Sequence, residues 1–203
     1  MKKIALVLAG LGLSSSAFAL ESGISETGLS YNEVGVGYVS STTNSGDFPG
    51  TSSGFNVGGQ ALITKNIFGF GSYAAPSGTY GALGNVDTSD YQAGLGLRTA
   101  VANNVDINLS ATYLNTKNSF LGISGIYTGY ATSASLRALV APKLEANLGI
   151  SYYDTKNERL GSSSGTQYRI GTGYQFAEKI MGRASYVTES GGNGYSVSLS
   201  YKF

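Results

Sequence analysis

The sequence contains no histidine and no cysteine, and its 203 residues include only three prolines. Without histidine, the usual general base of hydrolytic enzymes is missing. Without either residue type, the imidazole and thiolate ligands of zinc and copper sites are missing as well. Because no disulfide can form, covalent cross-links do not hold the fold together. We therefore expect a protein that is not an enzyme and that has no metal site and no cofactor.

Charged residues are also scarce, at 12% of the chain, whereas soluble domains typically contain about 25%. Glycine and tyrosine are abundant instead, with 30 and 15 residues. Leaving out Lys2 and Lys3, which belong to the segment described next, 11 basic residues face 12 acidic ones. A chain with this balance is not built to bind nucleic acid.

The first 19 residues have the three parts of a secretory signal peptide. Lys2 and Lys3 precede an apolar run at 4–13, and the small-residue site A-F-A ends at Ala19. The run is too short for a transmembrane helix, which needs about 20 residues. We expect a signal peptide at 1–19 and one domain at 20–203; a buried N-terminal helix is the alternative.

From residue 29 onward, apolar residues recur at every second position, which is typical of β-strands. Ten runs show this pattern, at 29–40, 54–63, 67–75, 91–100, 105–114, 129–140, 144–153, 166–176, 180–187 and 194–203. Most are close to the roughly 9–11 residues that a tilted strand needs to cross a bilayer. Short connections at 64–66, 101–104, 141–143 and 177–179 alternate with longer ones at 41–53, 76–90, 115–128, 154–165 and 188–193. Outer-membrane barrels alternate short turns and long loops in this way.

The charges and the aromatic residues indicate which face of each strand meets lipid. Bulky apolar residues take one parity of each run and charged residues take the other. A soluble sandwich would show the same segregation, with the apolar parity buried. Aromatic residues on the apolar parity, however, gather at both strand ends, as they do at the two membrane interfaces. We place Phe68 in this lipid-facing set and Tyr73, as an exception, on the inward face.

The predicted fold is therefore all-β: a transmembrane, antiparallel, up-and-down β-barrel of ten strands, with eight strands as the alternative. An even number of strands places both termini on the periplasmic side.

The polar parity predicts a charge network in the lumen. Its members are Glu33, Arg98, Asp106, Arg137, Glu145, Arg169 and Arg183, with Lys202 near the periplasmic exit. Glycines on the same parity, among them Gly69, Gly71, Gly94 and Gly96, leave room for these long side chains. Charges in a narrow ring are costly unless they are paired. Two interpretations remain open: a polar plug that makes the barrel rigid, and a narrow pore with a weak preference for anions.

Three further groups of residues are candidates for function. Lys117, Lys156 and Arg159 follow the outer tyrosines, at the height where lipopolysaccharide phosphates lie, and either contact these phosphates or are ordinary solvated charges. Asp87 and Asp90 are the nearest carboxylate pair, which we interpret as solvated turn residues. The segment 119–126 is unusually apolar for a loop tip, and either covers the barrel mouth or forms an adhesive contact.

The sequence contains an internal repeat and three segments that resemble known families. Residues 106–118 resemble residues 145–157, which indicates a repeat of one hairpin every 39 residues. With the signal peptide and the alternating strands, the final Y-S-V-S-L-S-Y-K-F resembles small bacterial outer-membrane β-barrels of the OmpA/OmpX-like kind. The segments L-S-Y-N-E-V-G-V-G-Y and N-I-F-G-F-G-S-Y are also similar to a ten-stranded family once proposed to be quorum-sensing factors. Unlike full OmpA-type proteins, the sequence has no peptidoglycan-binding domain.

The resemblance implies that the barrel assembly machinery reads the last strand, through Tyr195, Val197, Leu199, Tyr201 and Phe203. We expect a monomer in the outer membrane of a Gram-negative bacterium, with a structural or surface-interaction role and a polar, plugged lumen. The alternative is a narrow, porin-like pore that weakly prefers anions. Expected partners are outer-membrane lipids and lipopolysaccharide, the assembly machinery, and an extracellular ligand that the sequence does not identify.

Overall fold

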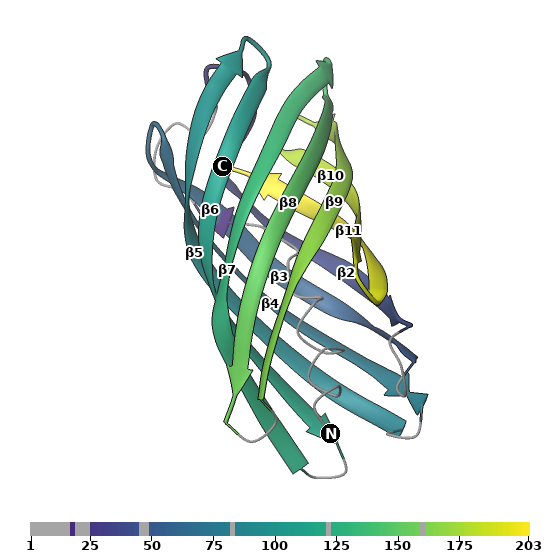
Figure 1. Cartoon of the computed structure of the whole chain (residues 1–203). Helices are drawn as coiled ribbons and strands as arrows, with labels where there is room; N and C mark the ends of the chain where they lie inside the picture. Colours follow the sequence, from purple (N-terminus) through teal and green to yellow (C-terminus); the bar gives the residue numbers. More distant parts are fainter. Residues whose placement is uncertain (1–16, 19–24, 45–48, 82–83, 121–122, 159–160) are drawn as a thin grey trace.

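A computed structural model of the chain describes residues 17–18, 25–44, 49–81, 84–120, 123–158 and 161–203. Most of the predicted signal peptide lies outside these residues, as does Arg159. Ten antiparallel strands, β2 to β11, close into a barrel in which each strand pairs with the next and β11 returns to β2 (Figure 1). The predicted ten-stranded barrel is confirmed, and the eight-stranded alternative is wrong.

The strands are longer than the sequence pattern predicts. Their bounds are β2 (Glu33–Thr43), β3 (Gly50–Thr64), β4 (Ile67–Tyr80), β5 (Gly84–Ala102), β6 (Val105–Phe120), β7 (Ile123–Ala141), β8 (Leu144–Asn157), β9 (Gly161–Ala177), β10 (Ile180–Glu189) and β11 (Gly192–Lys202). A two-residue strand, β1 (Ala17–Phe18), lies within the predicted signal peptide and pairs with β3 and β4. Within the described part of the chain, no helix has the length and apolar character to cross a membrane.

Two-residue turns join the strands at one end of the barrel, which we call the short-turn end. They lie at 65–66, 103–104, 142–143 and 178–179, within the four short connections that the sequence predicts. The C-terminus lies at the same end (Figure 1). Closure of the ring is also as predicted, because Tyr201 of β11 is paired with Val34 of β2.

At the opposite end, which we call the extended end, the predicted long loops are largely wrong. Seven residues of β5 precede Tyr91, and seven residues of β6 follow Tyr113. Together with the ends of β4 and β7, these continuations occupy most of the segments predicted as loops at 76–90 and 115–128. Seven residues of strand span about 23 Å at 3.3 Å per residue. Most residues of these continuations are polar, so the sequence shows no alternation there, and pairing with neighbouring strands makes them β-strand. The barrel wall therefore extends well beyond the girdle of outer tyrosines.

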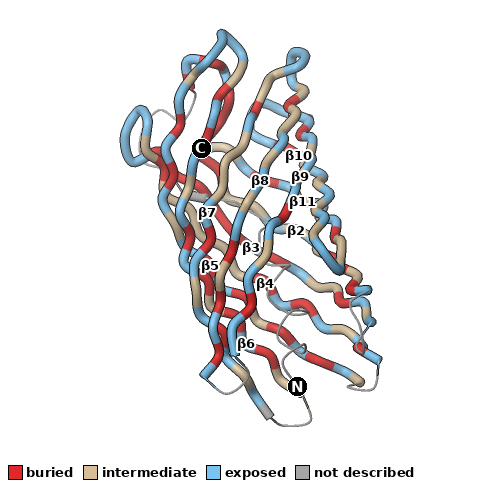
Figure 2. The backbone as a smooth tube through the Cα atoms, viewed as in Figure 1, coloured by how far each residue is buried: buried red, intermediate tan, exposed pale blue. Residues whose placement is uncertain are grey.

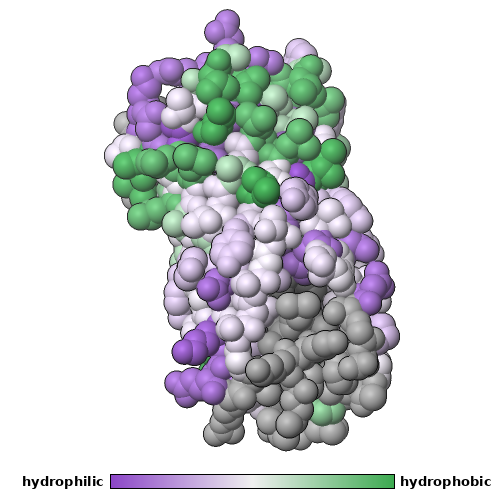
Figure 3. Space-filling view, viewed as in Figure 1, coloured by the Kyte–Doolittle hydropathy of each residue, from purple (hydrophilic) through white to green (hydrophobic). Residues whose placement is uncertain are grey.

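The outer surface carries an apolar band, and the inner surface is mainly polar. Leu95, Leu148, Ile170 and Leu199 point outward and are between 55% and 58% exposed. Buried and exposed residues alternate along most of the strands (Figure 2). In the face shown in Figure 3, hydrophobic residues gather over the half of the barrel nearest the short turns. A soluble β-sandwich would bury this parity, whereas here it forms the outside.

The two faces of strand β4 are exchanged relative to the prediction: the residues predicted to face lipid face the lumen, and those predicted to face the lumen lie outside. Phe68 points into the lumen and is 6% exposed, whereas Tyr73 lies outside, with its ring centroid 4.8 Å from that of Tyr91. The predicted inward glycines Gly69 and Gly71 lie on the outward parity with Tyr73. The prediction assumed that every bulky apolar side chain meets lipid. It fails here because the lumen contains apolar partners for Phe68.

The inward phenylalanines of β4 fill the space above two glycines of β5. A Cβ atom added to Gly96 would lie 2.1 Å from Phe68 Cζ, and one added to Gly94 would lie 2.5 Å from Phe70 Cζ. The glycines therefore accommodate aromatic rings of the neighbouring strand, and not the charged side chains that the sequence suggests. This arrangement packs ring against backbone along the β4–β5 pair.

A methyl group at Gly96 is expected to destabilise the barrel. Gly96→Ala forces the ring of Phe68 to move, and that ring is held against Tyr31 at a centroid distance of 5.4 Å. We expect the free energy of unfolding to fall by about 1–3 kcal/mol, the usual cost of overpacking a core. Urea unfolding of the refolded barrel measures this free energy. Gly149→Ala is the control, because its Cβ atom would approach no atom closer than 3.3 Å; an equal loss in both variants would contradict the explanation.

Candidate functional site in the barrel lumen

A segment ahead of the first barrel strand enters the lumen from the short-turn end. We call residues 25–32 the luminal segment. The sequence pattern predicts that residues 29–32 belong to the first strand, but β2 begins only at Glu33. A turn shapes the segment: Gly28 N donates to Ser25 O at 2.9 Å, and Leu29 N donates to Ser25 Oγ at 3.1 Å. Gly28 has φ of 77°, a left-handed conformation that glycine adopts without strain.

Tyr31 anchors the luminal segment inside the barrel, near the short-turn end. Its side chain is fully buried, and its hydroxyl lies 3.0 Å from Asp106 Oδ2 and 2.7 Å from Asn108 Oδ1. The guanidinium carbon of Arg137 lies 4.6 Å from the ring centroid, which is cation–π geometry. Leu29 also packs in the lumen, in one cluster with Tyr31, Leu62 and Phe68. The luminal segment is therefore held to the barrel wall by both polar contacts and apolar packing.

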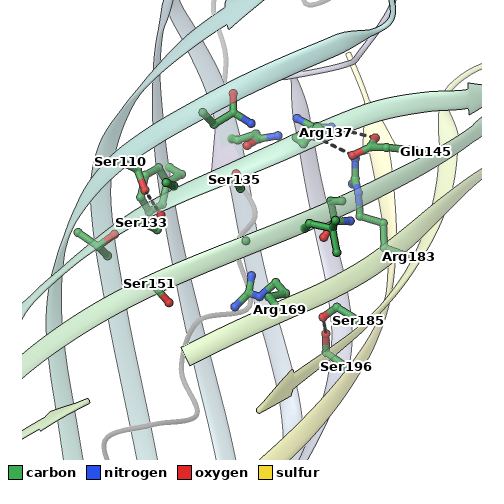
Figure 4. A pocket seen from close by; sticks show the side chains of 18 of the residues that line it. Ser110, Ser133, Ser135, Arg137, Glu145, Ser151, Arg169, Arg183, Ser185 and Ser196 are labelled. Carbon is green, nitrogen blue, oxygen red and sulfur yellow. Dashed lines mark hydrogen bonds and ion pairs between the residues drawn. The ribbon is translucent and has the colours of Figure 1, made fainter. Parts of the chain in front are cut away.

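The charged side chains of the lumen form a connected network around this segment. Arg137 binds Glu145 through two parallel contacts, with Nε at 2.7 Å from Oε1 and Nη2 at 2.9 Å from Oε2 (Figure 4). Arg183 bridges two acids: its Nη1 donates to Glu33 Oε2, and its Nη2 lies 3.6 Å from Glu145 Oε2. Gln60 donates a further hydrogen bond to Glu33 at 2.9 Å. Charges buried in this way are tolerated because each has a partner.

A second ion pair repeats the first at a spacing of 39 residues. Arg98 Nε lies 3.4 Å from Asp106 Oδ2, and both side chains are almost fully buried. In this pair, as in the pair of Arg137 with Glu145, the arginine lies before a short turn, and the acid lies after the turn, eight residues beyond the arginine. The predicted sequence repeat thus corresponds to two ion pairs at equivalent positions of the β5–β6 and β7–β8 hairpins.

Arg169 lies apart from the network, although the sequence groups it with the other luminal charges. Its backbone is paired with Gly149, which is four residues along β8 from Glu145 towards the extended end. Arg169 points into a luminal cavity of about 190 Å³ whose wall is rich in serine and asparagine (Figure 4). Among the residues that the structure describes, none forms a hydrogen bond or an ion pair with it. The structure therefore connects six of the seven predicted charges and leaves the seventh facing the cavity.

The interpretation of Asp87 and Asp90 as solvated turn residues is wrong, because both lie on a strand and Asp90 is buried. Both lie on β5 and not in a loop, but on opposite faces: Asp87 is exposed outside, whereas Asp90 is 4% exposed and points inward. The structure therefore excludes a metal site shared by these two carboxylates. Within the described ranges, no group of three or more acidic residues is placed to hold a metal ion.

The predicted surface residues lie on the outside of the barrel. Lys117 on β6 and Lys156 on β8 are both exposed, and their partners on the intervening β7 are only two residues apart. Phe120, at the predicted apolar tip, packs against buried Tyr80 and Val86. The side chains of the predicted assembly signal, Tyr195, Val197, Leu199, Tyr201 and Phe203, are all between 45% and 56% exposed on the outer face.

At the short-turn rim, an exposed ion pair ties the luminal segment to the β3–β4 turn. Glu26 binds the ammonium group of Lys65. This hydrogen bond and the charge of Lys65 lower the pKa of the Glu26 carboxyl below its usual value. Because both side chains are well exposed, the pair contributes little to stability.

Sequence reasoning missed the luminal segment, although one signal for it was present. In the first predicted strand, Val34, Val36 and Tyr38 define the outward parity. Leu29 and Tyr31 lie on the other parity, which is the parity of the lumen. Two bulky apolar residues on the polar face indicate an internal partner, and here that partner includes Phe68.

Similar solved structures are bacterial outer-membrane barrels. An outer-membrane channel from Pseudomonas putida F1 has a TM-score of 0.62 at 13% identity, over 92% of this chain and 97% of that one. The β domain of the Bordetella autotransporter BrkA has a TM-score of 0.58 at 11% identity, over 84% and 98% of the two chains. The translocator domain of the autotransporter NalP from Neisseria meningitidis has a TM-score of 0.50 at 15% identity, over 84% and 88%. No protein-family model and no curated protein matches the sequence. At these identities the likeness shows the fold, a closed antiparallel barrel of the outer-membrane type.

Proposed function

We propose that this protein is an integral barrel of the bacterial outer membrane with a structural or surface-interaction role and a lumen closed at its short-turn end. The observation that carries the proposal is the position of Tyr31, buried in the lumen and within hydrogen-bonding distance of Asp106 and Asn108. The luminal segment is anchored inside the barrel, and six luminal charges are paired around it. This packing makes the barrel rigid. Continuous flow of solute through the lumen would require this packing to open.

The short-turn end faces the periplasm in this proposal, and the signal peptide at 1–19 exports the chain. The luminal segment and the C-terminus both lie at that end, since Phe203 N donates to Asn32 O at 3.1 Å. In bacterial barrels the short turns are periplasmic, and the strand extensions and the 44–49 connection of this chain would correspond to their longer extracellular connections. The extended end then projects from the cell surface and offers the face on which an extracellular ligand would bind.

Lipid contacts and assembly follow from the same orientation. Lys117 and Lys156 lie on the outer face beyond the aromatic residues, where they would contact lipopolysaccharide phosphates; each such cation contributes about 1 kcal/mol near an anionic surface. The free, apolar last strand would be the part that the assembly machinery reads.

The protein has no enzymatic role in this proposal, since the sequence supplies no histidine or cysteine for catalysis.

A narrow pore with a weak anion preference is the second candidate. The luminal cavity of about 190 Å³ and the arginine that faces it favour this function. The similar protein from Pseudomonas putida F1 is a channel, which makes conduction a reasonable question for this barrel. The two candidates differ in one measurable property, because only a pore passes current without a change in the luminal segment.

Planar-bilayer recordings distinguish the two functions. Purified wild-type protein is expected to give no current steps above background, because the luminal segment fills the short-turn end. Tyr31→Ala removes the ring that anchors the segment and its hydroxyl contacts with Asp106 and Asn108, so we expect this variant to show current steps.

The matched control is Tyr38→Ala, which removes a tyrosine from the outward face of β2 and is expected to be silent. Anion-selective steps from wild-type protein would refute the closed-lumen proposal and support the pore. Silence of Tyr31→Ala would show that Tyr31 does not hold the lumen shut.

A further inference from the structure

Of the four luminal arginines that the structure describes, three are paired with a carboxylate and Arg169 is not. Arg98, Arg137 and Arg183 each lie within 3.6 Å of a carboxylate oxygen. Arg169 has no such contact within the described part of the chain. Its cross-strand neighbours carry no charge, since Gly149 lies opposite on β8 and Val187 lies opposite on β10.

The nearest acid on β10 is engaged elsewhere. Glu189 lies two residues beyond Val187, and its Oε2 accepts a hydrogen bond from Gln167 Nε2 at 3.2 Å. Along β9 towards the short-turn end, the next inward residue is Gly171, which carries no side chain that could reach Arg169. An arginine enclosed in this way loses part of its hydration without gaining a partner, which is costly.

The cavity in front of Arg169 offers hydroxyl groups that can donate hydrogen bonds. Figure 4 shows Arg169 with Ser151 on one side and Ser185 on the other. Ser135 on β7 also lines the cavity, close to the bare backbone of Gly149: a Cβ atom added there would lie 3.3 Å from Ser135 Cβ. The absence of a side chain at Gly149 keeps the space between Ser135 and Arg169 open.

We propose that Arg169, with the hydroxyls of Ser135, Ser151 and Ser185, forms a luminal binding site for a small oxyanion that carries a carboxylate or phosphate group. A guanidinium group presents a planar fork of N–H donors that matches the oxygens of these groups, and the serines add donors around it. Binding supplies the counter-charge that the barrel itself does not provide at this position. The site lies on the extended side of the ion-pair network, and it stands whether or not the lumen conducts.

The test uses the mature barrel in detergent, titrated with inorganic phosphate and, separately, with acetate. Ionic strength is held constant with sodium chloride, so that general screening does not change. A ligand that binds only the folded state raises the apparent unfolding temperature with the logarithm of its concentration once that concentration exceeds Kd. We expect this rise for at least one of the two anions, and a ³¹P line-broadening titration that saturates measures phosphate binding directly in the folded protein.

Three variants identify the site. Arg169→Gln is expected to abolish the response, and to unfold at or above the wild-type temperature without anion, because it removes an uncompensated charge. Arg169→Lys keeps the charge but loses the fork, so its affinity is expected to fall about tenfold or more. Lys143→Gln removes an exposed cation from the β7–β8 turn and is expected to respond like wild type. The proposal is overturned if neither anion raises the unfolding temperature of wild-type protein, if Arg169→Gln retains the rise, or if Arg169→Lys binds as tightly as wild type.

Discussion

Glu145→Gln is expected to lower the free energy of unfolding of the barrel by about 3–5 kcal/mol, the cost of leaving a buried charge without its partner. Glu145 accepts both contacts from Arg137 and also lies 3.6 Å from Arg183. The network contains three carboxylates and three paired arginines, so the neutral amide leaves one net positive charge in the lumen. Glutamine has nearly the shape of glutamate, which means that packing changes little and the loss reports on charge.

Urea unfolding in lipid vesicles, followed by gel mobility of heated and unheated samples, measures this loss. Glu178→Gln is the matched control, because Glu178 lies exposed in the β9–β10 turn, where we expect a change within about 0.5 kcal/mol. The double variant with Arg137→Gln restores the charge balance, so it is expected to be more stable than Glu145→Gln alone. A double variant that loses the full sum of both single effects would show that the two residues stabilise the barrel independently.

The ring of strands could be predicted because lipid imposes one simple rule on half of the residues. Every spanning strand must keep its charges off the outer face, and the period of two makes that rule visible in a single sequence. The short turns were equally predictable, since they interrupt the pattern at fixed places. The ends of β5, β6 and β7 were not, because most residues beyond Tyr91, Tyr113 and Tyr130 are polar on both faces, although the structure buries much of the inward face. Without a lipid face, nothing in composition separates such a strand from a loop.

The lumen was predictable in its composition and not in its pairing. The inward parity correctly assigns the seven charges to the interior, but it does not state the register between neighbouring strands. The register decides that Arg137 reaches Glu145 and that Arg169 lies opposite Gly149. The same applies to Phe68, whose inward direction depends on Tyr31 of the luminal segment. Parity rules describe a strand alone, and they fail where a separate part of the chain supplies the contact.

Leu148→Arg is expected to destabilise the barrel in a membrane by about 2–4 kcal/mol, the cost of a cation on the lipid face near the bilayer midplane. Leu148 is 55% exposed on the outer face of β8, and its partners Leu136 and Ile170 on β7 and β9 are outward and apolar too. The three side chains form an apolar row across the band, so the guanidinium group would have no acid to bind.

The matched control is Ser164→Arg, on the outer face of β9 but six residues from Ile170 towards the extended end. Ser164 is exposed and lies opposite Asp154, so an arginine there meets water and an acid, and we expect a change within about 0.5 kcal/mol. Both variants are compared by urea unfolding in phosphatidylcholine vesicles. If the apolar band faced water, Leu148→Arg would cost no more than Ser164→Arg, because a surface arginine is well hydrated. Equal stabilities would therefore refute the membrane-spanning orientation, whereas a loss confined to Leu148→Arg requires lipid around the middle of this barrel.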